Sequence, residues 1–319
     1  GRGAGDAGGA RMEAAALIGC LAVQLERKEL DECFASMLSL LLQLCHDVSE
    51  ARRIPALEAM LYIVRNCDEA KVRESAQGIL GAVEESFKWR GSPSVAVSFE
   101  IYSAVLPVFE PIASSNLLTP TESWREHFAS GYDLITSMVE LGDAAQKDLA
   151  LSMTLSLVNI AKGRMILRFG VFFDLLRSEF SHAAWSSGSS NDFTLISLPL
   201  LALRRVVETC WPRIAAHAGD ILGILLPAQE RFARAGASAV LRERLLADTV
   251  EILLVVRDCC PRKFTEMLAE AEGVVNQAGD LPSARRAIDA VRARRPSPTD
   301  ESCGDPAPEY IHPAFRSLF

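Results

Sequence analysis

The stretch that decides the fold is residues 198–226, LPLLALRRVVETCWPRIAAHAGDILGILL, in which two apolar stripes flank a proline. Apolar residues that recur every three or four positions lie on one face of a helix, and the first stripe consists of Leu200, Leu203, Val207 and Cys210. Pro212 ends this pattern, because proline inside a helix removes a hydrogen-bond donor but is tolerated at the first position of a new helix. The second stripe follows at Ile214, Ala218, Ile221, Leu222 and Leu225. The stretch therefore predicts two amphipathic helices that meet at a tight corner formed by Trp211, Pro212 and Arg213.

The same helical period recurs through residues 11–295 and predicts about a dozen helices with no convincing strand. Asp68 stands immediately before one of these stripes, where its side chain can cap the first turn of a helix, and another helix is predicted to start at Thr121-Glu122-Ser123. Two polar stretches, 114–121 and 185–192, interrupt the pattern and are predicted to be loops.

The connections between the predicted helices decide the fold class. Short turns make successive helices antiparallel neighbours, and the helix pairs recur at close to the roughly 40–47 residues of HEAT and armadillo units. We therefore predict an all-α fold, an α-solenoid of degenerate HEAT/armadillo-like helical hairpins, with a closed helical bundle as the alternative. Residues 11–295 are expected to form a single helical-repeat domain, with any sub-boundaries near 114–121 and 185–192. Residues 1–10 are expected to be a flexible leader and 296–319 a disordered tail with an apolar end.

The composition excludes several classes of protein. The 319 residues are 49% hydrophobic, which is too apolar for a disordered chain. No run approaches the roughly 20 uncharged apolar residues of a membrane-spanning helix, and a net charge of −8 disfavours nucleic acid and anionic membranes as partners. The eight cysteines show neither a CxxC pair nor zinc-ligand spacing, a pattern typical of reduced thiols. We therefore expect a cytoplasmic or nuclear protein.

Motifs that carry catalysis are missing from the sequence, which has no GxSxG, phosphate loop, HExxH or dinucleotide fingerprint. We therefore expect no enzymatic activity, no cofactor and no bound metal; an enzyme with an unrecognised site is the contrary hypothesis. The adjacent Cys259 and Cys260 are either a redox pair or, as we expect, one core thiol and one at a helix end. Similarly, the aromatic stripe lines either a ligand pocket or, as its helical spacing favours, the core; its members are Phe169, Phe173 and Phe180.

Two features near the C-terminus bear on partners. The basic residues within 285–295 have no interleaved aromatic residues, so a solvent-exposed helix face is favoured over a nucleic-acid surface. The segment 310–319 is apolar after a polar linker. It is either an ordinary chain end or a segment that docks in a groove of its own chain or of a partner, through Tyr310, Phe315 and Phe319.

Three short motifs carry a resemblance to a known family. They are Trp211-Pro212-Arg213-Ile214, the run Ile252-Leu253-Leu254 leading into Asp258-Cys259-Cys260-Pro261, and the segment from Gly163-Arg164-Met165-Ile166 to Leu175-Leu176-Arg177-Ser178-Glu179. Over roughly residues 130–295 the chain resembles the Tel-two-interacting protein two (Tti-two) family, which likewise has a Trp-Pro-Arg corner between two repeat helices.

This resemblance implies a non-enzymatic scaffold, a subunit of the triple-T (TTT) co-chaperone complex. Such a subunit binds Tel-two-like and Tti-one-like partners and helps the ninety-kilodalton heat-shock chaperone to mature phosphatidylinositol-3-kinase-related kinases. The alternative is a nuclear-transport-receptor-like or other HEAT/armadillo adaptor, for which binding to the GTP form of Ran is the test. Trp211 itself is expected to pack between adjacent helices, so Trp211→Ala should cost roughly 3–5 kcal/mol of stability.

Overall fold

The computed structural model describes residues 16–89, 91, 93–109, 120–162, 164–165, 169–190, 193–278 and 281–294, without the side chains of 169, 184–190, 193–195, 211 and 212. Within these ranges every regular element is a helix, which confirms the predicted all-α fold of stacked helical-repeat hairpins. A short helical segment, 16–24, comes first. The long helices that follow are α2 (Arg27–Cys45), α3 (Glu50–Asn66), α4 (Glu69–Ser86), α5 (Ser94–Phe109), α6 (Glu122–Leu141), α7 (Ala144–Ala161), α8 (Phe169–Ser190), α9 (Phe193–Thr209), α10 (Trp211–Arg234), α11 (Ala239–Cys259), α12 (Pro261–Ala278) and α13 (Pro282–Ala293).

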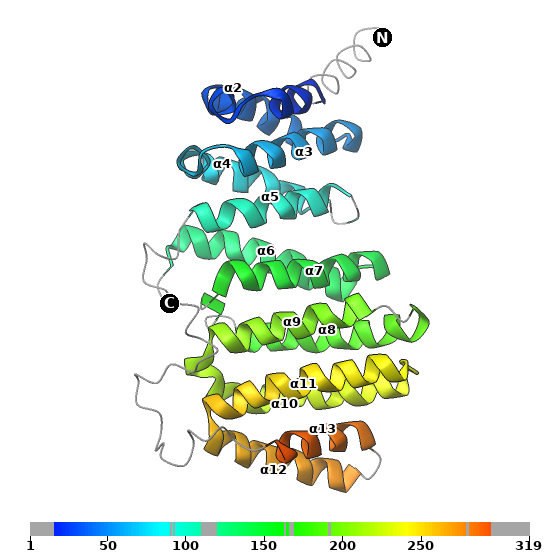
Figure 1. Cartoon of the computed structure of the whole chain (residues 1–319). Helices are drawn as coiled ribbons and strands as arrows, with labels where there is room; N and C mark the ends of the chain where they lie inside the picture. The colour runs from blue at the N-terminus through cyan, green and yellow to red at the C-terminus, as the bar shows by residue number, and fades with distance from the viewer. Residues whose placement is uncertain are drawn as a thin grey trace. The chain divides into compact units, whose positions relative to one another are not determined.

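The chain divides into two compact units, Gly1–Leu149 and Ala150–Phe319. In the first unit α2 contacts α3 and α4, α5 contacts α3 and α4, and α6 contacts α4 and α5. The even-numbered helices therefore form one layer and α3 with α5 the other, as the ribbon shows (Figure 1). This alternation is the arrangement of stacked antiparallel hairpins in a helical-repeat protein.

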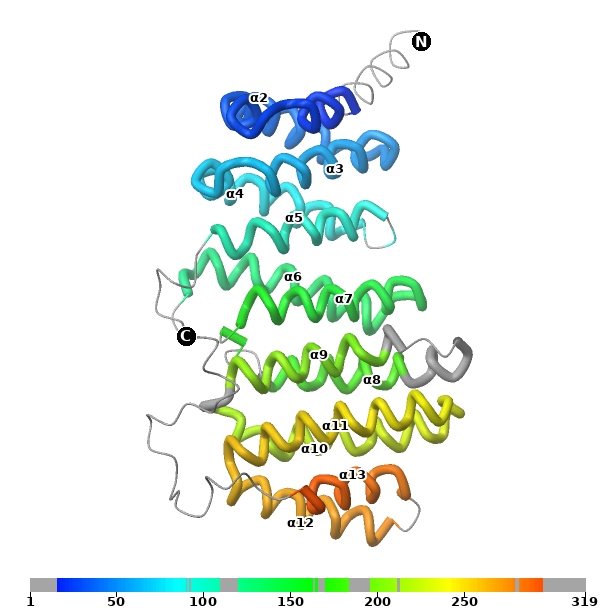
Figure 2. Tube along the Cα trace, viewed as in Figure 1, coloured from blue at the N-terminus to red at the C-terminus, as the bar shows by residue number. Residues whose placement is uncertain are grey.

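The second unit repeats this arrangement. Helix α10 contacts α8 and α12 in its own layer, while α11 contacts α9 and α13 in the other layer (Figure 2). Helices α8, α10 and α12 begin at residues 169, 211 and 261, a spacing on the order of that in HEAT and armadillo repeats. Helix α10 also contacts α9, α11 and α13, so it lies at the centre of the unit.

The stretch 198–226 forms most of α9 and α10, with the break at the predicted corner: α9 ends at Thr209, and α10 begins at Trp211 with proline in its first turn. Every member of the two predicted apolar stripes is at most 3% exposed. In contrast, Arg204 and Arg205 on the opposite face of α9 are exposed. The helical period in this stretch therefore identified the buried faces correctly.

The cap predicted at Asp68 is present, the helix expected from Thr121 also begins with a side-chain cap, and one predicted loop is wrong. The side chain of Asp68 accepts a hydrogen bond from the backbone N of Ala70 at 2.8 Å, and Thr121 accepts one from Trp124 at 3.3 Å. Residues 185–190, expected to belong to a polar loop, are instead the last turns of α8. Serine and glycine lower helix propensity by less than about 1 kcal/mol per residue, so the preceding helix continues through them. Most of 114–121 and all of 1–10 and 296–319 lie outside the described residues.

Candidate functional site

The second unit contains an apolar groove between α10 and α12, closed at one end by the first turn of α13. Its volume is about 580 Å³, within the range of roughly 300–1,000 Å³ of pockets that bury small ligands. The groove runs along α10 from Gly219 to Arg234, which at 1.5 Å per residue corresponds to roughly 20–25 Å of helix. It is therefore long enough to receive several turns of a partner segment.

The floor of this groove includes a row of positions on α10 that have little or no side chain. Gly219, Gly223 and Pro227 recur every fourth residue, so they lie above one another on that face, and all three are exposed. A Cβ atom added at Gly223 would meet no other atom within 4 Å. Because Pro227 has no backbone N–H, the carbonyl of Gly223 also lacks its usual helical donor. At Gly219, in contrast, an added Cβ atom would lie 3.4 Å from the sulfur of Met267. The floor is thus open backbone at Gly223, where another segment can approach closely.

The opposite wall comes from α12. Met267, Ala271, Val274 and Val275 line it at helical spacing. Val275 is buried, whereas Val274 is 60% exposed although it lies on an apolar face. The wall therefore offers apolar surface that the described helices leave in contact with water.

Charged residues surround the far end of the groove. Glu230 is buried, and its carboxylate accepts hydrogen bonds from the backbone N atoms of Ser283 at 3.1 Å and Ala284 at 3.4 Å. It also faces Arg234 at 3.7 Å. Arg231 donates to Ser181 of α8 at 2.6 Å. These contacts fix α13 against α10. The edge of the apolar surface carries two exposed guanidinium groups and one exposed carboxylate, Glu270 of α12.

The structure gives only a partial view of the predicted corner and none of the predicted docking tail. At the corner, Arg213 is exposed and its backbone N donates to Cys210 O at 2.9 Å. Trp211 and Pro212 open α10, but their side chains lie outside the description, as do Tyr310, Phe315 and Phe319. Their expected roles stay predictions.

The thiols of Cys259 and Cys260 are held in the protonated form. Burial raises the pKa of Cys259 to about 12 and that of Cys260 to about 11. Cys260 is buried and donates to Val256 O at 3.1 Å, while Cys259 is the last residue of α11. This geometry matches the expectation of a core thiol beside one at a helix end. The thiolate needed for rapid redox chemistry is disfavoured at both positions.

The aromatic stripe also belongs to the core. Phe173 and Phe180 are at most 1% exposed, and Phe172 beside them is equally buried. The side chain of Phe169 lies outside the description. The rings of Phe173 and Phe180 therefore pack in the core, as their helical spacing predicted, and do not line an open pocket.

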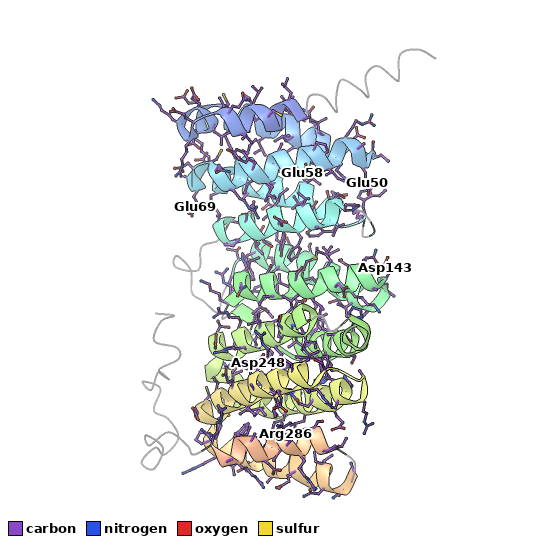
Figure 3. The ribbon with its side chains drawn as sticks, turned by 45° about the vertical axis from the view of Figure 1, so that its right-hand side comes forward. Glu50, Glu58, Glu69, Asp143, Asp248 and Arg286 are labelled. Carbon is purple, nitrogen blue, oxygen red and sulfur yellow. The ribbon has the colours of Figure 1, made fainter. Side chains whose placement is uncertain are left out.

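The basic run of α13 is largely matched by neighbouring acceptors. Arg286 (labelled in Figure 3) forms a bidentate pair with Glu243 of α11, at 2.6 and 3.0 Å. Arg292 pairs with Glu272 of α12 at 2.6 Å, and Arg285 bonds to Asn276. Guanidinium groups engaged by carboxylates are poorly placed to neutralise phosphates, so this face is an exposed helix surface held by ion pairs.

Two buried polar contacts lie away from the groove. In the first unit, His127 of α6 contacts Glu84 of α4 at 2.7 Å, and the hydroxyl of Tyr102 donates to His127 O at 3.0 Å. In the second unit, the fully buried carboxyl of Glu179 bonds to the hydroxyl of Thr154. Burial raises the pKa of Glu179 to about 8, and the Thr154 hydrogen bond opposes this shift. Both are contacts between helices, and none of their residues lines the groove.

Among the residues described, no group of three or more His, Cys, Asp and Glu side chains is placed to hold a metal ion. None of the described helices is both long enough and apolar enough to cross a membrane.

Comparison of the chain with protein-family models, with curated proteins and with solved structures finds no match. The resemblance to the Tti-two family, carried by the corner at Trp211 and two shorter motifs, therefore stays a prediction. The groove is the feature that sequence reasoning missed. Its signal was the recurrence of Gly219, Gly223 and Pro227 at four-residue spacing within the quoted α10 sequence and just beyond it.

Proposed function

We propose that this protein is a non-enzymatic interaction scaffold that binds a segment of another protein in the groove between α10 and α12. The observation that carries this proposal is the open apolar groove itself. Its floor is open at Gly223, where an added Cβ atom would meet nothing within 4 Å, and its wall includes the 60% exposed Val274. Apolar surface left in water at a concave site favours association, because covering it contributes roughly 25 cal/mol per Å² before the costs of binding.

The groove suits an amphipathic helix as its partner. A helix laid between two parallel ridges presents apolar anchors at positions i, i+4 and i+7, and a floor of glycine allows close approach of the two backbones. Arg231 and Arg234 at one end favour a partner segment with a carboxylate beside its apolar face. The described residues contain no strand to which an extended peptide could add.

The resemblance to the Tti-two family supplies candidate partners. On that basis we propose that the chain associates with Tel-two-like and Tti-one-like subunits in a co-chaperone assembly, in the cytoplasm or nucleus, and supports the maturation of phosphatidylinositol-3-kinase-related kinases. A helical-repeat architecture supports this proposal, because such proteins present long surfaces to other chains.

Affinity purification of the tagged chain from its source cells tests both levels of the proposal. Tel-two-like and Tti-one-like chains should be present in the bound fraction and depleted by Val274→Glu, which places a charge in the groove. Val240→Glu is the matched control, because Val240 is 79% exposed on α11 and does not line the groove. Absence of both subunits with the wild-type chain would reject the co-chaperone assignment. Equal recovery with the two glutamate variants would reject the groove as the binding surface.

A further inference from the structure

The chain carries a segment of its own whose sequence suits the groove. Residues 310–319, YIHPAFRSLF, place apolar side chains at Ile311, Phe315, Leu318 and Phe319. This is the i, i+4, i+7 and i+8 spacing of an amphipathic helix that lies in a groove. Pro313 falls within the first turn of such a helix, where proline is tolerated.

We propose that residues 310–319 dock in the groove between α10 and α12 of the same chain and regulate partner binding by occupying it. The regulatory part of this proposal rests on the proposed function. The apolar side chains of the segment cover Val274 and the glycine floor of α10. The segment and a partner helix then compete for one surface.

The length of the linker fits docking within one chain. The segment is joined to α13 by about 15 residues, 295–309, whose root-mean-square span is roughly 20 Å and whose extended span is roughly 50 Å. The first turn of α13 lines the groove through Leu281 and Ala284. Helix α13 has 12 residues, so its far end lies roughly 18 Å from that turn. The mean span of the linker therefore matches the distance that it must cross.

A matched linker makes docking in cis much more favourable than docking between copies. It raises the effective concentration of the segment at the groove to the millimolar range, far above the concentration of a second copy in ordinary solution. Contacts too weak to hold two chains together are therefore sufficient within one.

The charges of the linker support the same placement. Residues 295–309 contain four carboxylates, at Asp300, Glu301, Asp305 and Glu309, and one basic residue, Arg295, so the linker is acidic overall. The edge of the groove carries the exposed Arg231 and Arg234, of which Arg234 also faces Glu230 at 3.7 Å, and one exposed acidic residue, Glu270. Opposite charges at the edge of a docking site contribute modestly to affinity and favour one orientation over the reverse.

Photocrosslinking of the full-length chain tests the docking. The chain carries photoreactive benzoylphenylalanine in place of Phe315, and light and isotopically heavy copies are mixed before irradiation. We expect crosslinks to peptides of α10 and α12 within single copies. The yield should fall at least fivefold with Gly223→Leu and stay unchanged with Gly273→Leu. Both glycines are interior to helices and have nothing within 4 Å of an added Cβ, but only Gly223 lines the groove.

Three outcomes overturn the docking: crosslinks to other helices, crosslinks only between light and heavy copies, or equal yields with the two leucine variants. The same reporter in place of Ser302, in the linker, shows how much crosslinking tethering alone produces. The crosslink forms without a partner, so it can be observed even if the proposed scaffold function is wrong. Conversely, an absent crosslink rejects the docking of residues 310–319 and does not bear on partner binding.

The regulatory part has a separate readout. In the full chain, Phe315→Asp should raise the affinity for the co-purifying subunits about tenfold, as expected where the segment occupies the groove nine-tenths of the time. Ser302→Asp is the control for added charge and should leave the affinity unchanged. An unchanged affinity with Phe315→Asp overturns regulation by the segment.

Discussion

The carboxylate of Glu230 on α10 lies 3.1 Å from the backbone N of Ser283 and caps the first turn of α13. Helix α13 has Leu281 at its N-cap position, with no side-chain cap of its own, so its first N–H groups need an acceptor from elsewhere in the fold. Glu230 supplies this acceptor across 53 residues of sequence and places a negative charge at the positive end of the helix dipole. One buried side chain thereby fixes the helix that closes the groove.

Glu230→Ala should therefore lower the free energy of unfolding by about 1–2 kcal/mol. It should also speed hydrogen exchange in α13 more than in α8. Chemical denaturation and hydrogen exchange measured by mass spectrometry give the two readouts. Glu243→Ala is a matched control, because it removes an exposed carboxylate partner of the same helix, and surface ion pairs contribute at most about 1 kcal/mol. Equal effects of the two alanine variants would contradict the capping role.

The close approach of Tyr102 to Gly131 gives a second prediction. A Cβ atom at Gly131 would lie 2.6 Å from the Tyr102 hydroxyl, and this ring is fully buried and held by its hydrogen bond to His127 O. Gly131→Ala should therefore destabilise the protein by about 1–3 kcal/mol, the usual cost of overpacking a core. Gly78→Ala, in the interior of α4 with nothing within 4 Å of the added atom, should instead stabilise by roughly 0.5–1 kcal/mol. Thermal denaturation that shifts both variants in the same direction would contradict this explanation.

The buried Glu179 predicts a pH dependence of stability. Burial raises its pKa in the folded protein to about 8, so between the ordinary pKa of Glu, about 4.3, and pH 8 the folded state holds a proton that the unfolded state has lost. The favourable contribution is complete below the unfolded pKa and is lost as pH rises towards 8. Glu179→Gln should remove this dependence. Its stability relative to wild type should rise by a few kcal/mol between pH 5 and pH 8, measured by chemical denaturation. A constant difference between the two proteins across this range would refute the assignment.

The fold was predictable from the sequence where local periodicity determined it. The stripes at Leu203 and Ile221 are buried as expected, and Asp68 caps its helix, because spacing and cap chemistry act within one or two turns. The end of α8 was not predictable in the same way. The serines and glycine of 185–190 have weak helix propensity and indicated a loop, but in the folded chain these residues continue the helix. Glu230 and Gly131 act through partners on other helices, so their roles require the tertiary packing. Gly223 could be seen as a helical glycine, yet only the position of α12 shows that the space above it is open.

The measurement that tests the central claim most directly is the affinity of the co-purifying subunits for two full-length leucine variants. Gly223→Leu fills the floor of the groove, whereas Gly273→Leu makes the same change on α12 outside the groove, and neither added side chain begins in occupied space. Isothermal titration with the purified subunits should show binding weakened at least tenfold, about 1.4 kcal/mol, for Gly223→Leu. Gly273→Leu should bind like wild type. Equal affinities for the two variants would contradict the assignment of the groove between α10 and α12 as the partner-binding surface.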